Sequence, residues 1–538
     1  MLRFRHLLFT ILLVLLSGGF LCRGQVKLKD FGWDKARNGA ERAGVLYEAH
    51  KYAADHGSYV DYSGYKIIDI EITKGFKSIP LSDYNDFCGV VFNVKNTWKD
   101  LPLFTFTQKE TPVAVGKKLL DGTNFRSIRE LANGEYILII KDQTPWVDKR
   151  VGHDYAHIRK DILWIKDGRS ANKVISGYNT PESAPACSFC PVSSTDKVIA
   201  NFTLNRNKES TKRTDCMLVQ RQAHLRIRNI IINTPSGALT HDAAFKIEDC
   251  VDVTLSDIKV NGTYSKSDSF GYAFNFNNIW NTRFVRVDGY GEWGVMGHNN
   301  LSDTYLVQCH INRFDIHCYG RNLYLTDCVI DGGEKGWFCG GSGIYGTIQC
   351  DRCHYINAYP IYYGDSYKTA VGAEIVLNDC IFDVRPQKNA IFYTRVLNSN
   401  INPRPGLSQK CLPNITINNM TVNVPKGVKK VYLMDMYRQP TYEGTVGYMK
   451  RITINGLTVN AEDPASQVSF LFSSVPLVTE KGVSVSIKNM KAENAVVSMK
   501  CSSNRTDKVK IRQSDFLVKE NYREGLRVRT RGSNIRVF

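Results

Sequence analysis

Acidic residues are scarce relative to basic ones in this chain: 52 Asp and Glu residues accompany 70 Lys and Arg residues over 538 positions. The resulting net charge of +18 produces a field that attracts polyanions, although a basic surface that serves solubility alone is the alternative. Long apolar runs are also missing, because no segment after the first two dozen residues reaches the roughly 18 apolar residues of a membrane-spanning helix. The composition therefore predicts no membrane span and favours a negatively charged partner.

The first 24 residues have the parts of an export signal. Arg3 and Arg5 make a basic start, Leu7–Leu16 is a short apolar run, and a cleavage point is expected near Gly24. The residue before Cys22 is leucine and not a small residue, which argues against a lipoprotein. We therefore expect a secreted or periplasmic protein whose polyanionic partner is an acidic polysaccharide and not a nucleic acid.

One four-residue pattern recurs along the chain: an apolar residue, any residue, often Asn or Asp, and then an apolar residue or Cys. The shortest interval between successive copies runs from Leu306 to Leu325, and the longest runs from Leu377 to Ile417. Repeats at such intervals indicate a stacked-repeat protein. The eleven copies begin at Ile227, Leu255, Phe284, Leu306, Leu325, Cys350, Leu377, Ile417, Ile454, Ile487 and Ile511.

Each copy lies in a short segment of alternating polar and apolar residues, which predicts a strand. Strand-only repeats that cannot pair within themselves must pair with the copies before and after them. We therefore predict an all-β protein that resembles the pectate-lyase-like right-handed parallel β-helix. Residues 186–538 are expected to form its regular part, and residues 25–185 a cap and first irregular coils with long insertions. The helical spacing between Gly39 and Gly57 predicts a helix that caps the open end of the stack.

Cysteines occupy one repeated position. Cys309, Cys328, Cys353 and Cys380 end four successive copies of the pattern, where six of the seven other copies have Ile, Val, Leu or Met. We expect these four as free thiols that act as small apolar core residues. The lone CxxC at residues 187–190 has no partner pair, so a local disulfide or loop thiols are expected there instead of a zinc or redox site.

The two shortest intervals adjoin each other, from Phe284 to Leu306 and from Leu306 to Leu325. Coils this short leave no room for protruding loops, whereas the longer neighbouring coils do, so we expect a groove floor with walls on either side. The offset of the second interval places His298 against His317 in the next coil. Asp315 and Tyr319 alternate with apolar residues and are therefore expected to face solvent together with His317.

These residue types suit β-elimination from a uronic acid. A histidine serves as base because imidazole titrates near neutral pH. An arginine stabilises the negative charge that develops at the carboxylate, a tyrosine protonates the leaving oxygen, and the aspartate orients a histidine. The expected catalytic residues are His298, His317, Arg313, Tyr319 and Asp315. The expected substrate-binding residues are Arg321, Trp293, Asn300, Lys335, Trp337 and Tyr345.

Three alternatives stay open for this cluster. Stacked polar residues on a β-helix can form a ladder that only satisfies its own members. Hydrolysis would instead need two carboxylates, which Asp288, Glu292, Asp315, Asp331 or Glu334 could supply. A metal site lacks the spacing typical of zinc. We expect no cofactor, although a divalent cation such as Ca²⁺ stays open without a motif to support it.

Two short segments, Trp293–Gly297 and Arg313–Cys318, resemble a motif pair of exported β-helix proteins from the glycan systems of gut Bacteroidetes. The resemblance implies a polysaccharide lyase with a glycosaminoglycan such as chondroitin sulfate as substrate. Separately, we expect a monomer. The motifs Asn-Thr-Asp and Asp-Asp of the β-helix pectinases are missing, and only Gly297-His298-Asn299 weakly matches their Gly-His-Gly. A β-helix glycoside hydrolase and a non-catalytic glycan-binding protein or adhesin are the competing functions.

Overall fold

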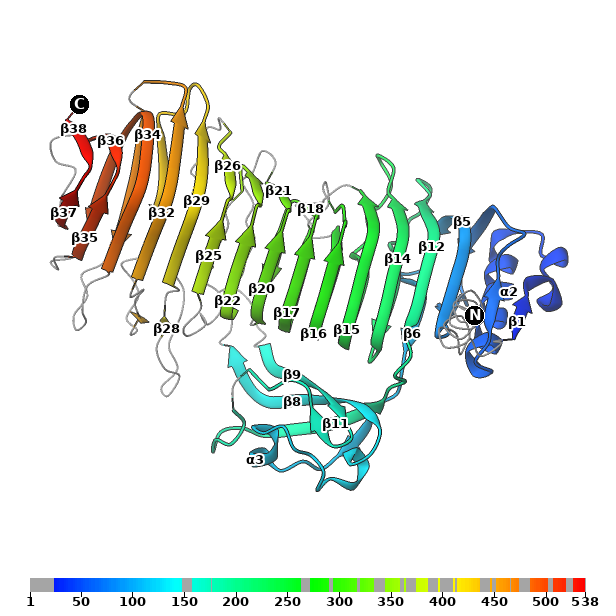
Figure 1. Ribbon diagram of the computed structural model, residues 1–538. Coiled ribbons are helices and arrows are strands. Elements are labelled where there is room, and N and C mark those ends of the chain that lie inside the picture. Colours follow the sequence, from blue (N-terminus) through cyan, green and yellow to red (C-terminus); the bar gives the residue numbers. More distant parts are fainter. Residues whose placement is uncertain are drawn as a thin grey trace, which may run out of the picture.

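The computed structural model describes residues 24–147, 157–175, 177–262, 271–289, 294–316, 320–332, 344–358, 362–363, 374–385, 395–396, 410–411, 414–435, 446–447, 451–464, 466–473, 484–501, 507–518 and 526–537. Strands stack coil upon coil along one axis, so that the chain forms a long parallel β-helix (Figure 1). The predicted all-β parallel β-helix is confirmed. Among the described residues, no helix is both long and apolar enough to cross a membrane.

The stack contains strands from both sides of one large insertion. Its strands are β3 (Ile67–Ile72), β4 (Ile79–Pro80), β5 (Tyr84–Asn96), β6 (Leu101–Thr107), β12 (Lys197–Arg206), β13 (Thr214–Gln220), β14 (Ala223–Asn233), β15 (Ala243–Asn261), β16 (Tyr272–Val285), β17 (Val295–Val307), β18 (His310–Ile311), β19 (Phe314–Ile316), β20 (Gly320–Thr326), β21 (Val329–Asp331), β22 (Ile344–Asp351), β23 (His354–Ile356), β24 (Tyr362–Tyr363), β25 (Glu374–Asn378), β26 (Ile381–Asp383), β27 (Arg395–Val396), β29 (Asn414–Val424), β30 (Lys430–Asp435), β32 (Arg451–Ala461), β33 (Ser466–Ser473), β34 (Ser484–Cys501), β35 (Asp507–Arg512), β36 (Asp515–Val518), β37 (Leu526–Arg531) and β38 (Asn534–Val537). A separate parallel pair joins β28 (Lys410–Cys411) to β31 (Val446–Gly447).

The sequence repeat sets the pairing of the coils. The first residue of each copy pairs with the first residue of the next copy in all ten steps, from Ile227 with Leu255 to Ile487 with Ile511. Each interval in the repeat is therefore the length of one coil.

The third position of the repeat is a corner of the coil. All eleven residues at this position have a positive φ, between 50° for Gln513 and 85° for Gly456. Asn, Asp and Gly tolerate this left-handed conformation better than other residues do, which explains why Asn and Asp recur there. The chain turns at this residue, and the next residue points into the core.

The core is one continuous apolar column inside the stack. The cysteine ladder belongs to it, because Cys309, Cys328, Cys353 and Cys380 are buried free thiols. The neighbouring thiol of Cys328, together with burial, raises the pKa of Cys309. The expectation of core thiols is confirmed.

The expected capping helix is α2 (Gly39–Asp55), which begins after Asn38, whose side chain accepts a hydrogen bond from the Glu41 amide. The helix packs against β3 and β4 and so covers the open end of the stack. Its buried His50 lies 2.7 Å from the Tyr62 hydroxyl, and burial lowers the pKa of His50 to about 3. Two short 3₁₀ helices, Leu28–Phe31 and Trp33–Lys35, and the strand pair β1 (Gln25–Lys27) and β2 (Tyr59–Asp61) complete the cap.

The insertion between β6 and β12 is a sheet of its own. Its five strands run antiparallel where they pair, in the order β10-β9-β8-β11-β7, and Figure 1 shows them beside the stack. The strands of the stack stop at Thr107 and resume at Lys197. The segment between them is therefore a separate sheet and does not form coils of the stack. Its elements are β7 (Thr111–Val113), α3 (Lys117–Leu120), a 3₁₀ helix (Arg129–Leu131), β8 (Glu135–Val147), β9 (His157–Lys166), β10 (Arg169–Ser170) and β11 (Pro185–Pro191).

Both faces of β8 are apolar, which explains how the insertion is placed. Leu138 and Ile140 face a core inside the insertion, whereas Ile137 and Ile139 pack toward Val251 of the stack. The CxxC divides in the same way, because Cys187 packs against the inner core and Cys190 belongs to the cluster that joins the stack. Both are free thiols on strand β11, so neither the local disulfide nor the loop position expected from the sequence is present.

Candidate functional site

The predicted groove floor has the predicted register. Gly297 pairs with Ile316, and Leu301 pairs with Gly320, so the pairing offset is the expected one on both sides of His317. The backbone of His298 lies in β17 opposite Asn277 of β16. His317 and Tyr319 lie outside the described residues, and their position against His298 stays a prediction.

The inward residues of this floor are those expected from the alternation, because Phe314 and Ile316 are buried. The backbone of Asp315 lies in β19 opposite Met296. Arg313 differs from the expectation: it is only 6% exposed and belongs to the interior, not to a cationic surface. It precedes β19 at the end of a tight turn, and its carbonyl accepts a hydrogen bond from the Val295 amide.

Two of the expected substrate-binding residues contact the insertion. Asn300 is 3% exposed, and its Nδ2 lies 3.4 Å from Oδ1 of Asp161 in β9. Arg321 is half-buried, and its Nη2 donates to the carbonyl of Lys173 at 3.2 Å. Both side chains therefore hold the insertion in this structure, and Asn300 is not available to a substrate.

The other four expected substrate-binding residues add little. Trp293, Lys335 and Trp337 lie outside the described residues. The backbone of Tyr345 lies in β22 and pairs with Arg321. The structure therefore places this residue one coil beyond the predicted floor.

Asp161 is the centre of a buried polar network that joins the insertion to the stack. Its carboxylate accepts hydrogen bonds from the Tyr178 hydroxyl at 2.7 Å and from Nε of Arg159 at 3.2 Å. Asn278 of β16 adds the contact from the stack. Its Nδ2 donates to the Asp161 carbonyl and, at 2.7 Å, to the carboxylate of Asp249. Burial raises the pKa of Asp249, against the opposing effect of Lys160.

A second polar contact fastens the edge of the insertion. His224, at a coil corner with a φ of 54°, lies between two carboxylates: Nε2 is 2.6 Å from Glu135 of β8, and Nδ1 is 2.8 Å from Asp252 of the next coil. Trp164 of β9 also donates to Glu135, at 2.8 Å. Burial alone would raise the pKa of Asp252, but its hydrogen bonds with Arg226 and His224 hold it below the ordinary value.

The insertion therefore forms a wall at one side of the predicted floor. Asn278 and Asn300, which it contacts, lie within β16 and β17, directly after Asn277 and two residues after His298. The walls expected from the longer neighbouring coils stay a prediction. The repeat could not locate the insertion, because residues 111–191 supply it and not the coils next to the floor.

A row of acidic and basic side chains lies on another face of the stack. Of its members, the sequence analysis named only Asp288 and Asp331, as possible carboxylates for hydrolysis. His354 of β23 lies 2.6 Å from Asp383 of β26, and Arg385 lies 3.2 Å from Asp331 of β21. In the coils before them, Nδ1 of His310 lies 3.6 Å from Asp288. A signal was present in the sequence, since His310 and His354 both directly follow the inward cysteine of a repeat.

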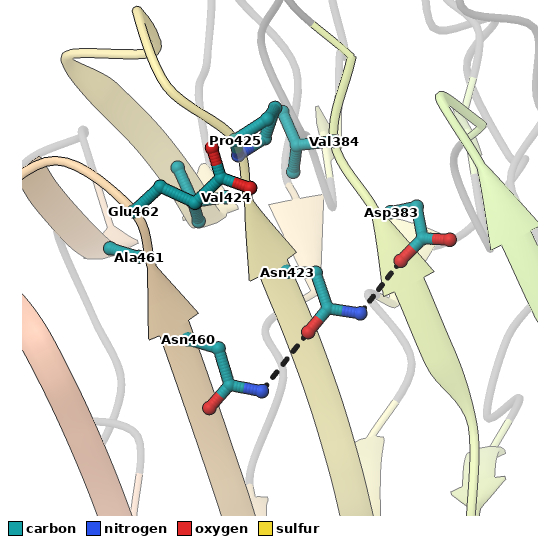
Figure 2. Close-up of a pocket in the computed structure, with 8 residues that line it drawn as sticks. All are labelled: Asp383, Val384, Asn423, Val424, Pro425, Asn460, Ala461 and Glu462. Atoms are coloured by element: carbon teal, nitrogen blue, oxygen red, sulfur yellow. Dashed lines mark hydrogen bonds between the residues drawn. The ribbon is translucent and has the colours of Figure 1, made fainter.

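A pocket of about 350 Å³ lies beside this row (Figure 2). Asp383, Asn423 and Asn460, from three successive coils, form a hydrogen-bonded line along it: Asn423 donates to Asp383 at 2.7 Å, and Asn460 donates to Asn423 at 3.0 Å. The remaining lining residues are Val384, Val424, Pro425, Ala461 and Glu462. Over the described ranges, no group of three His, Cys, Asp or Glu side chains is arranged to hold a metal ion.

The fold and its wall define this chain as a parallel β-helix protein with an inserted antiparallel sheet. Among solved structures, the tailspike protein gp49 from Pseudomonas phage LKA1 is 13% identical, with a TM-score of 0.46 over 93% of this chain and 81% of that chain. The tailspike gp61 of Pseudomonas phage phi297 is 10% identical, with a TM-score of 0.48 over 86% and 83%. The gp54 tailspike of Acinetobacter baumannii bacteriophage AP22, in complex with A. baumannii capsular saccharide, is 12% identical, with a TM-score of 0.45 over 95% and 76%.

No protein-family model and no curated protein matches this chain. Likenesses this distant do not transfer a substrate or a mechanism. The functional conclusion therefore depends on the residues of the chain itself.

Proposed function

We propose that this protein binds an acidic polysaccharide along the floor made by β16, β17 and β19 and cleaves it by β-elimination. A glycosaminoglycan such as chondroitin sulfate is the first substrate to test. The observation that supports the proposal is the register of the two short coils beside the insertion: the backbone of His298 lies in β17 two residues before Asn300, which contacts Asp161 of the insertion. The net charge of the chain, +18, favours a polyanion as the partner.

In the proposed reaction, His298 or His317 removes the proton next to the uronate carboxylate, and Tyr319 protonates the leaving oxygen. Asp315 orients one of the histidines. Arg321 is the remaining candidate for the substrate carboxylate, because it is half-buried whereas Arg313 is buried. To reach a substrate, Arg321 would have to exchange its contact with the Lys173 carbonyl.

The test is a panel of acidic glycans (chondroitin sulfate, hyaluronan, heparin and pectic polymers) followed by the ultraviolet absorbance of the unsaturated uronate product. Of His298→Ala and His317→Ala, the variant that removes the base should abolish turnover. The matched control is His310→Ala, which removes an outward histidine from the same coil on a different face. Full activity in both floor variants would overturn the site, and the lack of the absorbance with every polymer would overturn the reaction.

Hydrolysis is a second candidate because the row of acidic and basic side chains contains both Asp331 and Asp383. Asp331 and Asp383 occupy one register position two coils apart, with Ile356 between them. Two strand spacings separate such positions by about 10 Å, close to the upper end of the carboxylate separations in inverting glycosidases. Hydrolysis would release reducing ends without the uronate absorbance, and Asp331→Asn should then abolish it while His298→Ala does not. A non-catalytic protein would bind the glycan and give neither signal.

A further inference from the structure

The pocket in Figure 2 lies far along the stack from the proposed cleavage floor. It is formed at the ends of β26, β29 and β32, whereas the floor is formed by β16, β17 and β19. The nearest strand of the pocket, β26, belongs to the coil of β25, which is three coils beyond the coil of β17 and corresponds to about 14 Å along the stack. A ligand in the pocket is therefore not in contact with His298.

The pocket presents fixed amide groups to solvent. One N–H of Asn423 is held by Asp383, and the Asn423 carbonyl oxygen is held by Asn460. Each amide has two N–H donors and two acceptor positions on its oxygen, so the line leaves further donors and acceptors in fixed orientations. Such pairs of a donor and an acceptor complement sugar hydroxyls, which both donate and accept.

The rim of the pocket is also held in place. Glu462 accepts a hydrogen bond from the Lys426 amide at 2.8 Å, and Asp463 accepts one from the Gly427 amide at 2.6 Å. These bonds fasten the turn after β29 to the coil that follows. The apolar residues Val384, Val424, Pro425 and Ala461 complete the lining and offer surface for the C–H groups of a sugar ring.

The charge of the lining is opposite to that of the whole chain. Asp383 and Glu462 are its only ionisable residues, and none of the eight residues that line the pocket is basic. His354, next to it, is held by Asp383. A uronate or sulfate group would meet two carboxylates and no lining cation, so an acidic sugar is disfavoured here even though the net charge of the chain is +18.

We propose that this pocket is a second glycan site, which binds an uncharged sugar residue through Asn423, Asn460 and Glu462 and discriminates against uronate and sulfate groups. Its volume of about 350 Å³ is at the lower end of the range for small-molecule pockets. The site does not depend on cleavage at the floor. It would hold a neutral glycan, or the neutral part of a mixed one, at a distance from the floor.

A matched pair of variants tests this site. Asn233 occupies the same register position as Asn423 in an earlier part of the stack, donates to Asn205 at 2.9 Å and accepts from Asn261 at 2.9 Å. Asn423→Ala and Asn233→Ala each remove two ladder bonds at one register position, although Asn423 donates to a carboxylate and Asn233 to an amide oxygen. Only the first variant removes a pocket residue. Each variant is compared with the full chain by thermal unfolding, to show that the stack is retained.

Binding is measured by isothermal titration calorimetry with neutral oligosaccharides of galactose, mannose and N-acetylglucosamine, and with short uronate oligomers. At least one neutral oligosaccharide should bind. Asn423→Ala should raise its dissociation constant about tenfold, because the variant loses the binding free energy of roughly one hydrogen bond. Asn233→Ala should leave the affinity unchanged. The affinity for uronate oligomers should be the same in Asn423→Ala as in the full chain. The affinity for neutral oligosaccharides should be unchanged in His298→Ala.

The proposal is overturned if no neutral oligosaccharide binds, if both asparagine variants lose affinity equally, or if uronate binding depends on Asn423. Should Asn423→Ala fail to fold, Glu462→Ala replaces it, because this side chain is exposed at the rim and should also weaken neutral binding. Failure of the lyase assay leaves these outcomes untouched, so the two proposals fail separately.

Discussion

The buried carboxylate of Asp161 offers a direct test of how the insertion is held. Asp161 is 1% exposed and its partner Arg159 is 3% exposed. Four donors surround the carboxylate: Nε of Arg159, the Tyr178 hydroxyl, the Ile175 amide and Nδ2 of Asn300. Asp161→Asn keeps the shape of the side chain but turns an N–H₂ group toward donors and removes the charge that balances Arg159.

Removing one partner of a buried ion pair costs about 3 kcal/mol or more, because the other charge stays buried without compensation. The control is Asp257→Asn, which breaks a pair of the same chemistry at the surface. Arg286 contacts Asp257 at 2.6 and 2.8 Å, but their side chains are 55% and 38% exposed. Exposed pairs of this kind contribute about 1 kcal/mol or less.

Amide hydrogen exchange measures the local stability of the insertion strands in the two variants. In Asp161→Asn, the amides of β8 and β9 should exchange roughly a hundredfold faster, since about 1.4 kcal/mol corresponds to a factor of ten. The amides of β32 and β34 should not change, because they belong to distant coils. Unchanged exchange in β9, or an equal effect of Asp257→Asn, would refute the conclusion that this network holds the insertion.

Three further predictions concern the cap, the corners and the thiols. The pKa of buried His50 is lowered to about 3. The free energy of unfolding should therefore be highest above about pH 6.5 and fall by up to about 1.4 kcal/mol per pH unit as the pH drops below that value. The exchange of the α2 amides should follow this slope, and His50→Gln should remove the slope. Gln308 has a φ of 54°, so Gln308→Val should lower the thermal midpoint by the equivalent of about 1–2 kcal/mol, whereas Gln308→Gly should not. Burial raises the pKa of Cys190 to about 11, whereas Cys88 is exposed; iodoacetamide in mildly basic buffer should label Cys88 first, and peptide mapping that finds Cys190 labelled first would contradict the buried position.

The sequence did not predict the role of the insertion. The apolar run at residues 137–140 predicts a buried strand, but it does not say that its two faces pack on different partners. Asn300 shows the consequence. As one of several polar residues near His298 it was expected to bind substrate, yet the insertion, more than a hundred residues earlier in the chain, covers it.

The pocket shows a similar limit. Asp383, Asn423 and Asn460 are separated by 40 and 37 residues, as the coil intervals are, so their alignment follows from the repeat. Whether an aligned row borders a pocket depends on the turns between coils, and those turns follow no pattern. The comparable row of Asn205, Asn233 and Asn261 has the same hydrogen bonds and is not part of this pocket.

The sequence by itself determined the stacking of the strands, the coil lengths, the inward thiols and the capping helix. These features depend on local periodicity and, at the coil corners, on residues that tolerate a positive φ. Only the tertiary structure decided that Arg313 is buried, that Asn300 and Arg321 hold a wall, and that a pocket lined by Asp383 and Glu462 lies beside a row of histidines and carboxylates. These features depend on contacts between segments far apart in the chain, and a one-dimensional repeat carries no information about such contacts.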